Sequence, residues 1–250
     1  MKKVIYTVLT GNYDLLQQPG AVDSGWDYVC FTDRSGKDGV WELREIPFQS
    51  DNQILRARYA KLHPHLLLPE YELSVFMDAN LCITSPVFYE RVSGCMSAFG
   101  VLEHPQRDCV YEELRYCYLK RMIGTSAAFS LLRRLKAQGM PHHAGLYETN
   151  VLLRRHHSPE MRALDARWWE NLLASGATRD QLCLTPSLFQ ERLSPALLLG
   201  HGLNARNVPF ILYTVHPRSG KENFPGRLNW ANLKYNLSLL WRKLMLVCLK

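Results

Sequence analysis

The sequence predicts an α/β fold, a three-layer sandwich with a mostly parallel central sheet. Apolar segments of strand length alternate with helical segments along the chain, which is typical of such sheets. The 250 residues, 47% of them hydrophobic, are enough to bury a sizeable core. Several strands end on polar residues, and α/β sheets bind ligands outside the carboxyl ends of their strands. The sequence therefore predicts a ligand crevice at that edge.

In the first half of the chain, turn residues separate apolar runs that are rich in β-forming residues. The polar run at 50–53 is typical of a capping box, so a helix is expected from there to about His63. Another helix is expected to begin at Pro86. The strands expected here are Val4–Leu9, Tyr28–Thr32, Leu73–Met77 and Leu81–Thr84.

The second half continues the alternation, with Ser158 and Thr178 as expected helix caps. The expected strands are Ala98–Glu103, Leu146–Leu153 and Phe210–Val215. The expected helices are Arg107–Arg121, Ser126–Gln138, Pro159 to about Ser175, and one opening near Arg179. With no internal repeat or long linker, we expect one domain over residues 1–229 and a basic amphipathic helix over 230–250.

The composition narrows the classes of partner and compartment. The net charge of +7 comes from basic residues spread through the chain, without a recognised nucleic-acid module, which favours an anionic small substrate or a membrane surface. None of the seven cysteines has C-x-x-C spacing, so a reducing, cytoplasmic location is expected. No run of 18 apolar residues occurs, and we expect neither export nor a membrane span.

The sequence Asp78-Ala79-Asn80 joins two apolar strands and carries the most specific chemistry. Two oxygen-bearing side chains two residues apart at a strand end can reach one hard divalent cation. His216, after the last expected strand, would complete a ligand set that suits Mn²⁺ better than Ca²⁺. The alternative is ordinary turn chemistry for Asp78 and Asn80 and a structural role for His216.

Other polar side chains are expected at the same crevice. Arg58 and Lys61 share one helical face and could meet a diphosphate, with a solvated or ion-paired face as the alternative. The strand ends that could supply base and ribose contacts are Thr10, Asn12 and Tyr13 after the first strand and Asp33 after the second.

Six motifs, in this order and spacing, resemble a glycosyltransferase-like family from bacterial capsule and lipopolysaccharide gene clusters and from plant cell-wall and mucilage proteins. The resemblance covers roughly residues 4–190. The motifs are Thr10-Gly11-Asn12-Tyr13-Asp14, Cys30-Phe31-Thr32-Asp33, Arg58-Tyr59-Ala60-Lys61-Leu62-His63-Pro64-His65, Met77-Asp78-Ala79-Asn80, Gly145-Leu146-Tyr147-Glu148-Thr149-Asn150 and Arg179-Asp180-Gln181.

This resemblance implies a GT-A, Rossmann-like fold, with a nucleotide-sugar donor bound by the first half and an acceptor by the second. The chain is also distantly similar to glycogenin-type transferases. That similarity implies that Asp78, Asn80 and His216 hold a divalent metal, Mn²⁺ or Mg²⁺, and that Lys221 touches phosphate. The chain departs from that pattern in having Asn80 where the pattern has a second Asp, which lowers the ligand charge.

An inverting transferase needs a carboxylate to accept the proton of the acceptor hydroxyl, and Asp180 and Glu148 are the candidates. Asp180 would also suit a helix N-terminus without any catalytic role. A retaining enzyme needs no base there. The residues expected to contact acceptor or sugar are His104, Arg107, Asn150 and Gln181, with a simple loop as the alternative for 104–108 and backbone pairing for Asn150.

The function expected from these features is metal-assisted transfer of a sugar, from UDP-hexose, to a polysaccharide or lipid-linked oligosaccharide of the cell surface. One alternative is a catalytically inactive module that binds nucleotide sugars, and a nucleotidyltransferase ranks last. Trp168 and Trp169 could stack on sugar or pack in the core. The basic tail from Leu233 could lie on an anionic membrane or dock on the domain.

Overall fold

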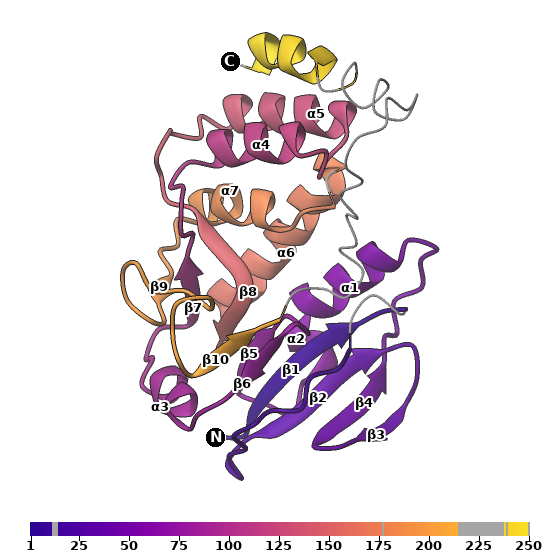
Figure 1. The fold of residues 1–250 in the computed structure, drawn as a ribbon, viewed down its shortest axis with the longest axis vertical. Coiled ribbons are helices and arrows are strands. Elements are labelled where there is room, and N and C mark those ends of the chain that lie inside the picture. Colours follow the sequence, from indigo (N-terminus) through magenta and orange to yellow (C-terminus); the bar gives the residue numbers. More distant parts are fainter. Residues whose placement is uncertain (12–14, 177, 215–237, 239, 250) are drawn as a thin grey trace, which may run out of the picture.

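The computed structural model describes residues 1–11, 15–176, 178–214, 238 and 240–249. Its main sheet has eight strands, of which β3 and β8 run opposite to the other six (Figure 1). The α/β class with a mostly parallel sheet is therefore confirmed. In spatial order the strands are β3 (Gly36–Asp38), β4 (Trp41–Glu45), β2 (Asp27–Thr32), β1 (Lys3–Leu9), β5 (Leu73–Met77), β8 (Tyr147–Arg154), β7 (Phe99–Glu103) and β9 (Ala196–Leu197).

The central strands are apolar on both faces because both faces of the sheet are covered. In β1, Ile5 belongs to the hydrophobic cluster on one face, whereas Val4 and Tyr6 belong to the cluster on the other. All three are fully buried. Successive side chains of a strand point to opposite faces, so a continuous apolar run in the sequence becomes two cores.

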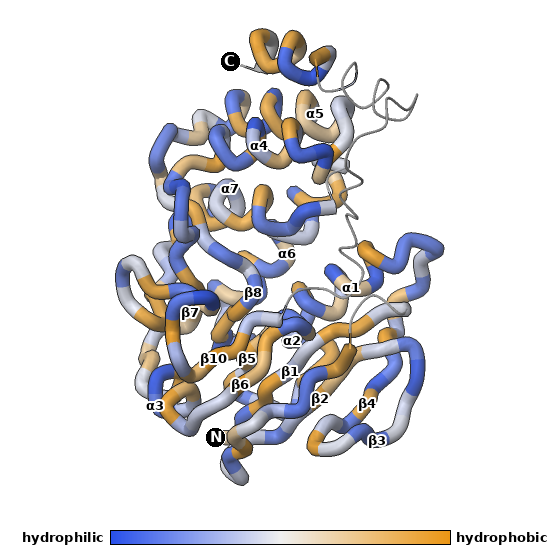
Figure 2. Tube along the Cα trace, viewed as in Figure 1, coloured by the Kyte–Doolittle hydropathy of each residue, from blue (hydrophilic) through white to orange (hydrophobic). Residues whose placement is uncertain are grey.

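Helices cover one face of the sheet (Figures 1 and 2). A short helix and a separate antiparallel pair of strands cover part of the other face. The first face carries α1 (Gln53–Leu62), α2 (Pro64–Leu67), α6 (Pro159–Ser175) and α7 (Gln181–Glu191). The second carries α3 (Val87–Ser93) and the antiparallel pair β6 (Leu81–Ile83) and β10 (Ile211–Tyr213). A third cluster lies beyond α6 and α7, around α4 (Val110–Leu119) and α5 (Thr125–Ala137).

Three features differ from the sequence-based expectations. The strands expected at 81–84 and 210–215 pair with each other and lie outside the main sheet. The strands β3 and β4 were not expected. The helix α7 has Asp180 at its N-cap position, two residues after the expected cap Thr178. Of the tryptophans, Trp168 is fully buried in the core, as its alternative interpretation predicts.

The expected boundary at residues 229 and 230 lies outside the described residues. Residues 240–245 are helical and continue into a 3₁₀ turn at Leu246–Leu249. Within the part of the chain that the structure describes, no helix is both long enough and apolar enough to cross a bilayer.

Candidate active site

The helix α1 carries two cations toward the sheet. It begins at Asn52, whose side-chain oxygen accepts hydrogen bonds from the backbone N–H of Ile54 and Leu55, at 3.0 and 3.2 Å, so the helix starts at a fixed residue. Arg58 and Lys61, three residues apart, lie on one face of this helix. Lys61 is only 1% exposed, which is unusual for a lysine without a paired carboxylate.

The paired carboxylate is that of Asp180. Its Oδ2 lies 2.7 Å from Lys61 Nζ, and its Oδ1 lies 3.1 Å from Arg58 Nε. The indole N–H of Trp168 donates to the Asp180 carbonyl at 2.8 Å, which anchors the backbone at the start of α7. The motif residues at 58–61 and 179–181 therefore meet, although about 120 residues separate them.

These charges decide the ionisation of Asp180. Burial alone would raise the pKa of its carboxyl, but the charges of Arg58 and Lys61 outweigh burial and leave the pKa well below its usual range. Burial lowers the pKa of Lys61, while Asp180 and Asp78 favour its charged form. Asp180 is therefore a stable anion at neutral pH and a weak base.

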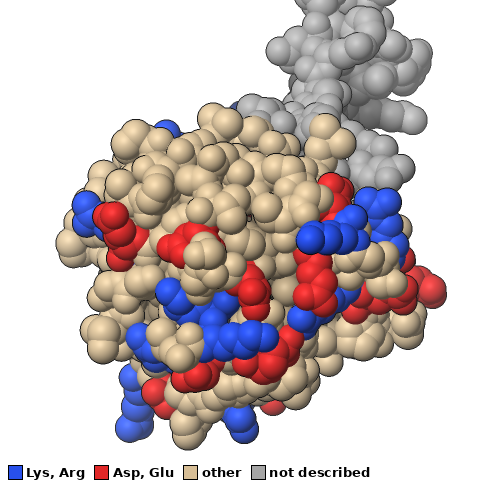
Figure 3. All heavy atoms as spheres, turned by 90° about the horizontal axis from the view of Figure 1, so that it is seen from below, with Lys and Arg blue, Asp and Glu red and all other residues tan. Residues whose placement is uncertain are grey.

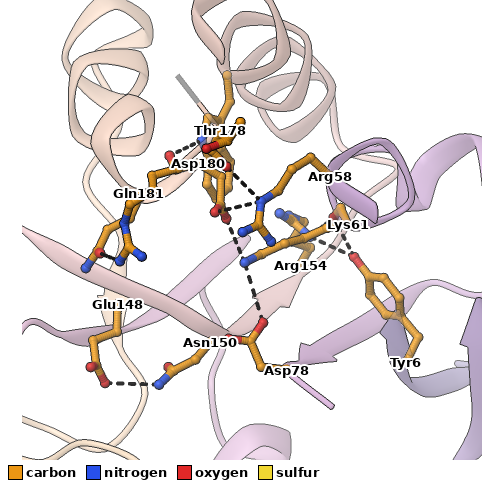
Figure 4. A network of polar contacts seen from close by, with 12 residues as sticks. Tyr6, Arg58, Lys61, Asp78, Glu148, Asn150, Arg154, Thr178, Asp180 and Gln181 are labelled. Carbon is orange, nitrogen blue, oxygen red and sulfur yellow. Dashed lines mark hydrogen bonds and ion pairs between the residues drawn. The ribbon is translucent and has the colours of Figure 1, made fainter. Parts of the chain in front are cut away.

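Asp78 gives Lys61 a second, more open neighbour. It follows β5 directly, and its backbone N–H donates to the Asn150 carbonyl on β8 at 2.9 Å. Its Oδ1 lies 3.8 Å from Lys61 Nζ, and its side chain is 39% exposed. Lys61 thus lies between a buried carboxylate and an exposed one, as the dashed lines in Figure 4 show.

Asn80 is held by the neighbouring strand pair. Its side-chain NH₂ donates to the Thr214 carbonyl at 3.1 Å, and the Thr214 hydroxyl donates to the Asn80 carbonyl at 2.8 Å. Because the amide nitrogen is engaged, the carboxamide oxygen is the atom left for a ligand. This oxygen and the exposed Asp78 carboxylate are donors that a hard divalent cation accepts.

The metal set expected from the sequence is only partly described. His216 and Lys221 lie outside the described residues. Among the described ones, no three His, Cys, Asp or Glu side chains form a group that could hold a metal. The described donors that fit a divalent cation are therefore Asp78 and Asn80.

Asp33 organises the loop after β1. One carboxylate oxygen accepts the backbone N–H of Gly11 at 2.7 Å, and the other lies 2.7 Å from Arg56 NH1 on α1. Gly11 has φ +59°, a conformation that favours glycine. The hydroxyl of Thr10 donates to the Gln53 carbonyl at 3.4 Å. Of the other residues expected here, Asn12 and Tyr13 lie outside the described residues.

A small cavity adjoins Asp78, and no residue pattern in the sequence predicts it. It is lined by Thr7 and Trp41 among others, and its volume is about 10 Å³, room for at most about one water molecule. The Thr7 hydroxyl is buried and has no hydrogen-bond partner within the described part of the chain. An ordered water in this cavity would satisfy such a buried hydroxyl.

Glu148 and Asn150 lie on the same face of β8, as their spacing predicts. The Asn150 side-chain NH₂ donates to Glu148 Oε2 at 3.1 Å. The other Glu148 oxygen pairs with the guanidinium of Arg206, a residue that the sequence analysis did not nominate. Asn150 Oδ1 is buried and lacks a hydrogen-bond partner among the described residues.

An open pocket of about 550 Å³ lies at the other end of this strand face. His104 and Arg107, which the sequence nominated as acceptor residues, line it together with Tyr147 at the start of β8. Arg107 Nε donates to Glu113 at 2.6 Å, and His104 Nδ1 accepts the Arg107 backbone N–H at 3.0 Å. Burial lowers the pKa of His104, which favours a neutral ring.

The pocket and the charge cluster are linked along β8. Tyr147 lines the pocket, its carbonyl accepts from Gln181 Nε2 at 3.1 Å, and the Asn150 carbonyl accepts from Asp78. Three residues of an extended strand span about 10 Å. The structure thus brings Arg58, Lys61, Asp78 and Asp180 together, with Glu148 and Asn150 beside them on β8 (Figure 4). Tyr147, which precedes Glu148, lines the pocket.

The sequence matches no family model and no curated protein. Among solved structures, the chain is similar to the bifunctional glycosyltransferase WbbM in its apo form, with a TM-score of 0.45 and 10% identity over 77% of this chain. The chain spans 38% of that protein's length. It is also similar to mouse xyloside xylosyltransferase 1 in its apo form, with a TM-score of 0.44, 10% identity, 77% of this chain and 83% of that one covered.

Proposed function

We propose that this chain is a cytoplasmic glycosyltransferase that transfers a sugar from a nucleotide donor, UDP-hexose, to a polysaccharide or lipid-linked oligosaccharide of the cell surface. The observation that carries the proposal is the position of Lys61 at the carboxyl end of the parallel strands. Its ammonium group is buried, held by Asp180, and adjoins the exposed carboxylate of Asp78.

In the proposed reaction the acceptor hydroxyl oxygen bonds to the anomeric carbon as the bond from that carbon to the diphosphate oxygen breaks. The electron pair of the broken bond leaves with the diphosphate. Arg58 and Lys61 stabilise this charge, because cations fixed in a partly dry site need not reorganise as the charge develops. Asp180 holds both cations in place.

A divalent cation, Mn²⁺ or Mg²⁺, when bound by Asp78, Asn80 and His216, would act as a Lewis acid on the diphosphate. Lys221 would add a further phosphate contact. The loop residues Thr10, Asn12, Tyr13 and Asp33 would contact the nucleoside.

The acceptor is proposed to occupy the 550 Å³ pocket. Glu148 is favoured over Asp180 as the group that takes the hydroxyl proton, since it adjoins Tyr147 at the pocket wall, whereas two cations hold the pKa of Asp180 low. His104 and Arg107 would contact the acceptor. Asn150 and Gln181 would position sugar hydroxyls.

The test is nucleotide release from a panel of UDP-sugars, with and without Mn²⁺, by the wild type and by Asp78→Asn. We expect the variant to lose at least about 100-fold in turnover, the usual size for loss of a group that stabilises transition-state charge. Glu170→Gln is the control, because that carboxylate lies in an exposed pair with Arg167 on α6. Undiminished release by Asp78→Asn would contradict the proposed site.

A second candidate function is a module that binds nucleotide sugars without turnover. It is favoured by one observation: the two carboxylates nominated as bases, Asp180 and Glu148, are both engaged with cationic side chains. This function predicts that UDP-sugars bind and protect the chain against heat, while no acceptor or water releases UDP.

A further inference from the structure

The C-terminal helical segment, residues 240–249, docks on α4 and α5. Arg242 NH1 donates to the carbonyls of Tyr118 and Ile123 at 2.6 and 3.2 Å, and its guanidinium lies 4.6 Å from the Tyr118 ring centre. Met245 and Leu246 pack against the hydrophobic cluster of these helices. Figure 1 shows the segment, in yellow, beyond α4 and α5 at the end of the molecule farthest from β3.

The opposite face of this segment is an exposed apolar stripe. Leu240, Leu244 and Val247 are 56%, 63% and 69% exposed, and Trp241 is 49% exposed. At about 100° per residue, positions 240, 244 and 247 fall within about 60° of one another and opposite positions 242, 245 and 246. The segment thus has apolar side chains on two opposite faces, and only the face with Met245 and Leu246 is covered.

The charge of the chain is concentrated at the same end. Among the described residues, 114–147 contain six Lys or Arg and no acidic residue, and Arg242 and Lys243 add two more. The other described residues have 17 basic and 21 acidic side chains, a net charge of −4. We call α5, the end of α4 and residues 240–249 the basic pole.

The opposite end of the molecule looks different. There, Lys and Arg lie beside Asp and Glu across the surface (Figure 3). Exposed pairs such as Arg34 with Asp38 and Lys2 with Asp27 balance the charge locally. The excess of basic over acidic residues is therefore found at the pole that carries the apolar stripe.

We propose that the basic pole docks the chain on an anionic lipid bilayer, with the stripe of residues 240, 241, 244 and 247 in the interface. Apolar side chains flanked by tryptophan and lysine are typical of helices that lie in the plane of a membrane. Trp241 borders the stripe on one side and Lys243 on the other. Basic side chains near the surface add attraction to anionic headgroups.

A second copy of this chain is the other occupant that the stripe could accept. Pairing two basic poles would bring like charges together, which opposes association. A stable interface also buries about 800 Å² on each partner, and the uncovered stripe belongs to one segment of ten residues. An anionic bilayer fits both the charge and the shape.

The pole also adjoins the candidate active site. A pocket of about 210 Å³ beside the segment is lined by Arg121, Arg242 and Thr178, and guanidinium groups are suited to a headgroup phosphate. The Thr178 carbonyl accepts from Arg58 Nε at 3.4 Å. If the proposed function holds, a lipid-linked acceptor at this pocket would lie near Thr178, whose carbonyl contacts one of the cations that would bind the donor.

The test is sedimentation of the full chain with phosphatidylcholine vesicles, with and without phosphatidylglycerol. We expect at least tenfold tighter binding to the anionic vesicles, weakened by 0.5 M salt, and a tenfold loss in Leu244→Glu. The matched control is Leu66→Glu, because Leu66 on α2, at 56%, is nearly as exposed as Leu244, at 63%. Brominated lipid should quench the tryptophan fluorescence of the wild type more strongly than that of Trp241→Phe.

Equal binding to neutral and anionic vesicles, or unchanged binding by Leu244→Glu, would overturn the proposal. The proposal would also be overturned if the wild type bound no vesicles but formed a dimer, and Leu244→Glu converted that dimer into a monomer. The melting temperature of each variant checks folding, which a 63% exposed side chain should not alter. Vesicle binding needs no donor or acceptor, so the result is separate from the outcome of the turnover assay.

Discussion

At the scale of single residues, Lys61 has two carboxylate neighbours that differ in exposure. The Asp180 side chain is 5% exposed and lies 2.7 Å away, whereas the Asp78 side chain is 39% exposed and lies 3.8 Å away. Asp180 therefore serves as the permanent counter-ion. The carboxylate of Asp78 is more exposed and farther from Lys61. A bound anion could replace it beside Lys61, and a bound cation could be coordinated by it.

Replacing the counter-ion tests this division. Asp180→Asn leaves Lys61 buried without its carboxylate, and breaking a buried ion pair costs about 3–5 kcal/mol. We expect that loss in urea unfolding at pH 7. The control Glu170→Gln removes an exposed pair on α6 and should change stability by about 0.5 kcal/mol or less.

The same variant gives a prediction for pH. The pKa of Asp180 is lowered in the folded state, so below about pH 5 the unfolded chain binds protons that the folded chain does not. The wild type should therefore lose stability on acidification more steeply than Asp180→Asn. Parallel stability curves from pH 7 to pH 3 would contradict the ion pair.

His156 is a second buried titratable group, outside the candidate site. Its ring nitrogens lie 2.9 Å from the Ser74 hydroxyl and 3.1 Å from the Leu68 carbonyl, and burial lowers its pKa to about 4. Between pH 6.5 and 4 the unfolded chain takes up the proton first, so stability falls with falling pH there. His156→Gln should flatten unfolding curves in this window.

The matched control is His201→Gln, since the His201 side chain is 88% exposed. His201→Gln should leave the pH dependence of the unfolding free energy as in the wild type. The slopes of the two variants should differ by at most about 1.4 kcal/mol per pH unit. A His156→Gln curve that keeps the wild-type slope would show that another group titrates.

At the scale of elements, the pair β6 and β10 fixes the position of Asn80. Asn80→Asp would place a carboxylate against the Thr214 carbonyl, where the amide now donates at 3.1 Å. Leaving such a buried acceptor unpaired costs about 1–3 kcal/mol, so thermal unfolding should shift downward. Thr214→Val, which removes one hydroxyl donor, should cost less, and a stabilised Asn80→Asp would contradict this geometry.

The strands differ in how well the sequence predicts them. β1, β2 and β5 are apolar on both faces, and their residues identify them directly. β4 has the sequence Trp-Glu-Leu-Arg-Glu, with Trp41 and Leu43 buried. This alternation has only two apolar positions and no β-branched residue, which makes it a weak strand signal. The reversed direction of β8 is a property of chain topology that local sequence does not encode.

At the scale of the whole molecule, the sequence predicts that certain polar residues come together better than it predicts their individual contacts. Arg58, Lys61, Asp78 and Asp180 were nominated separately and meet in space. The pairing of Glu148 with Arg206 spans 58 residues and depends on how the segment after β9 returns across the sheet. Sequence spacing alone does not predict a contact between residues so far apart in the chain.

The central claim is that the cations of α1 hold the diphosphate of a nucleotide. Calorimetric titration with UDP and with uridine measures the contribution of the diphosphate to affinity. Arg58→Gln removes one cation and leaves the ion pair between Lys61 and Asp180 in place. The control is Arg44→Gln, because the Arg44 side chain is 25% exposed and paired, much like Arg58 at 27%. We expect UDP to bind more tightly than uridine, and Arg58→Gln, unlike Arg44→Gln, to lose at least tenfold in UDP affinity alone. Equal affinities for UDP and uridine, or an Arg58→Gln affinity equal to the wild type, would contradict the claim.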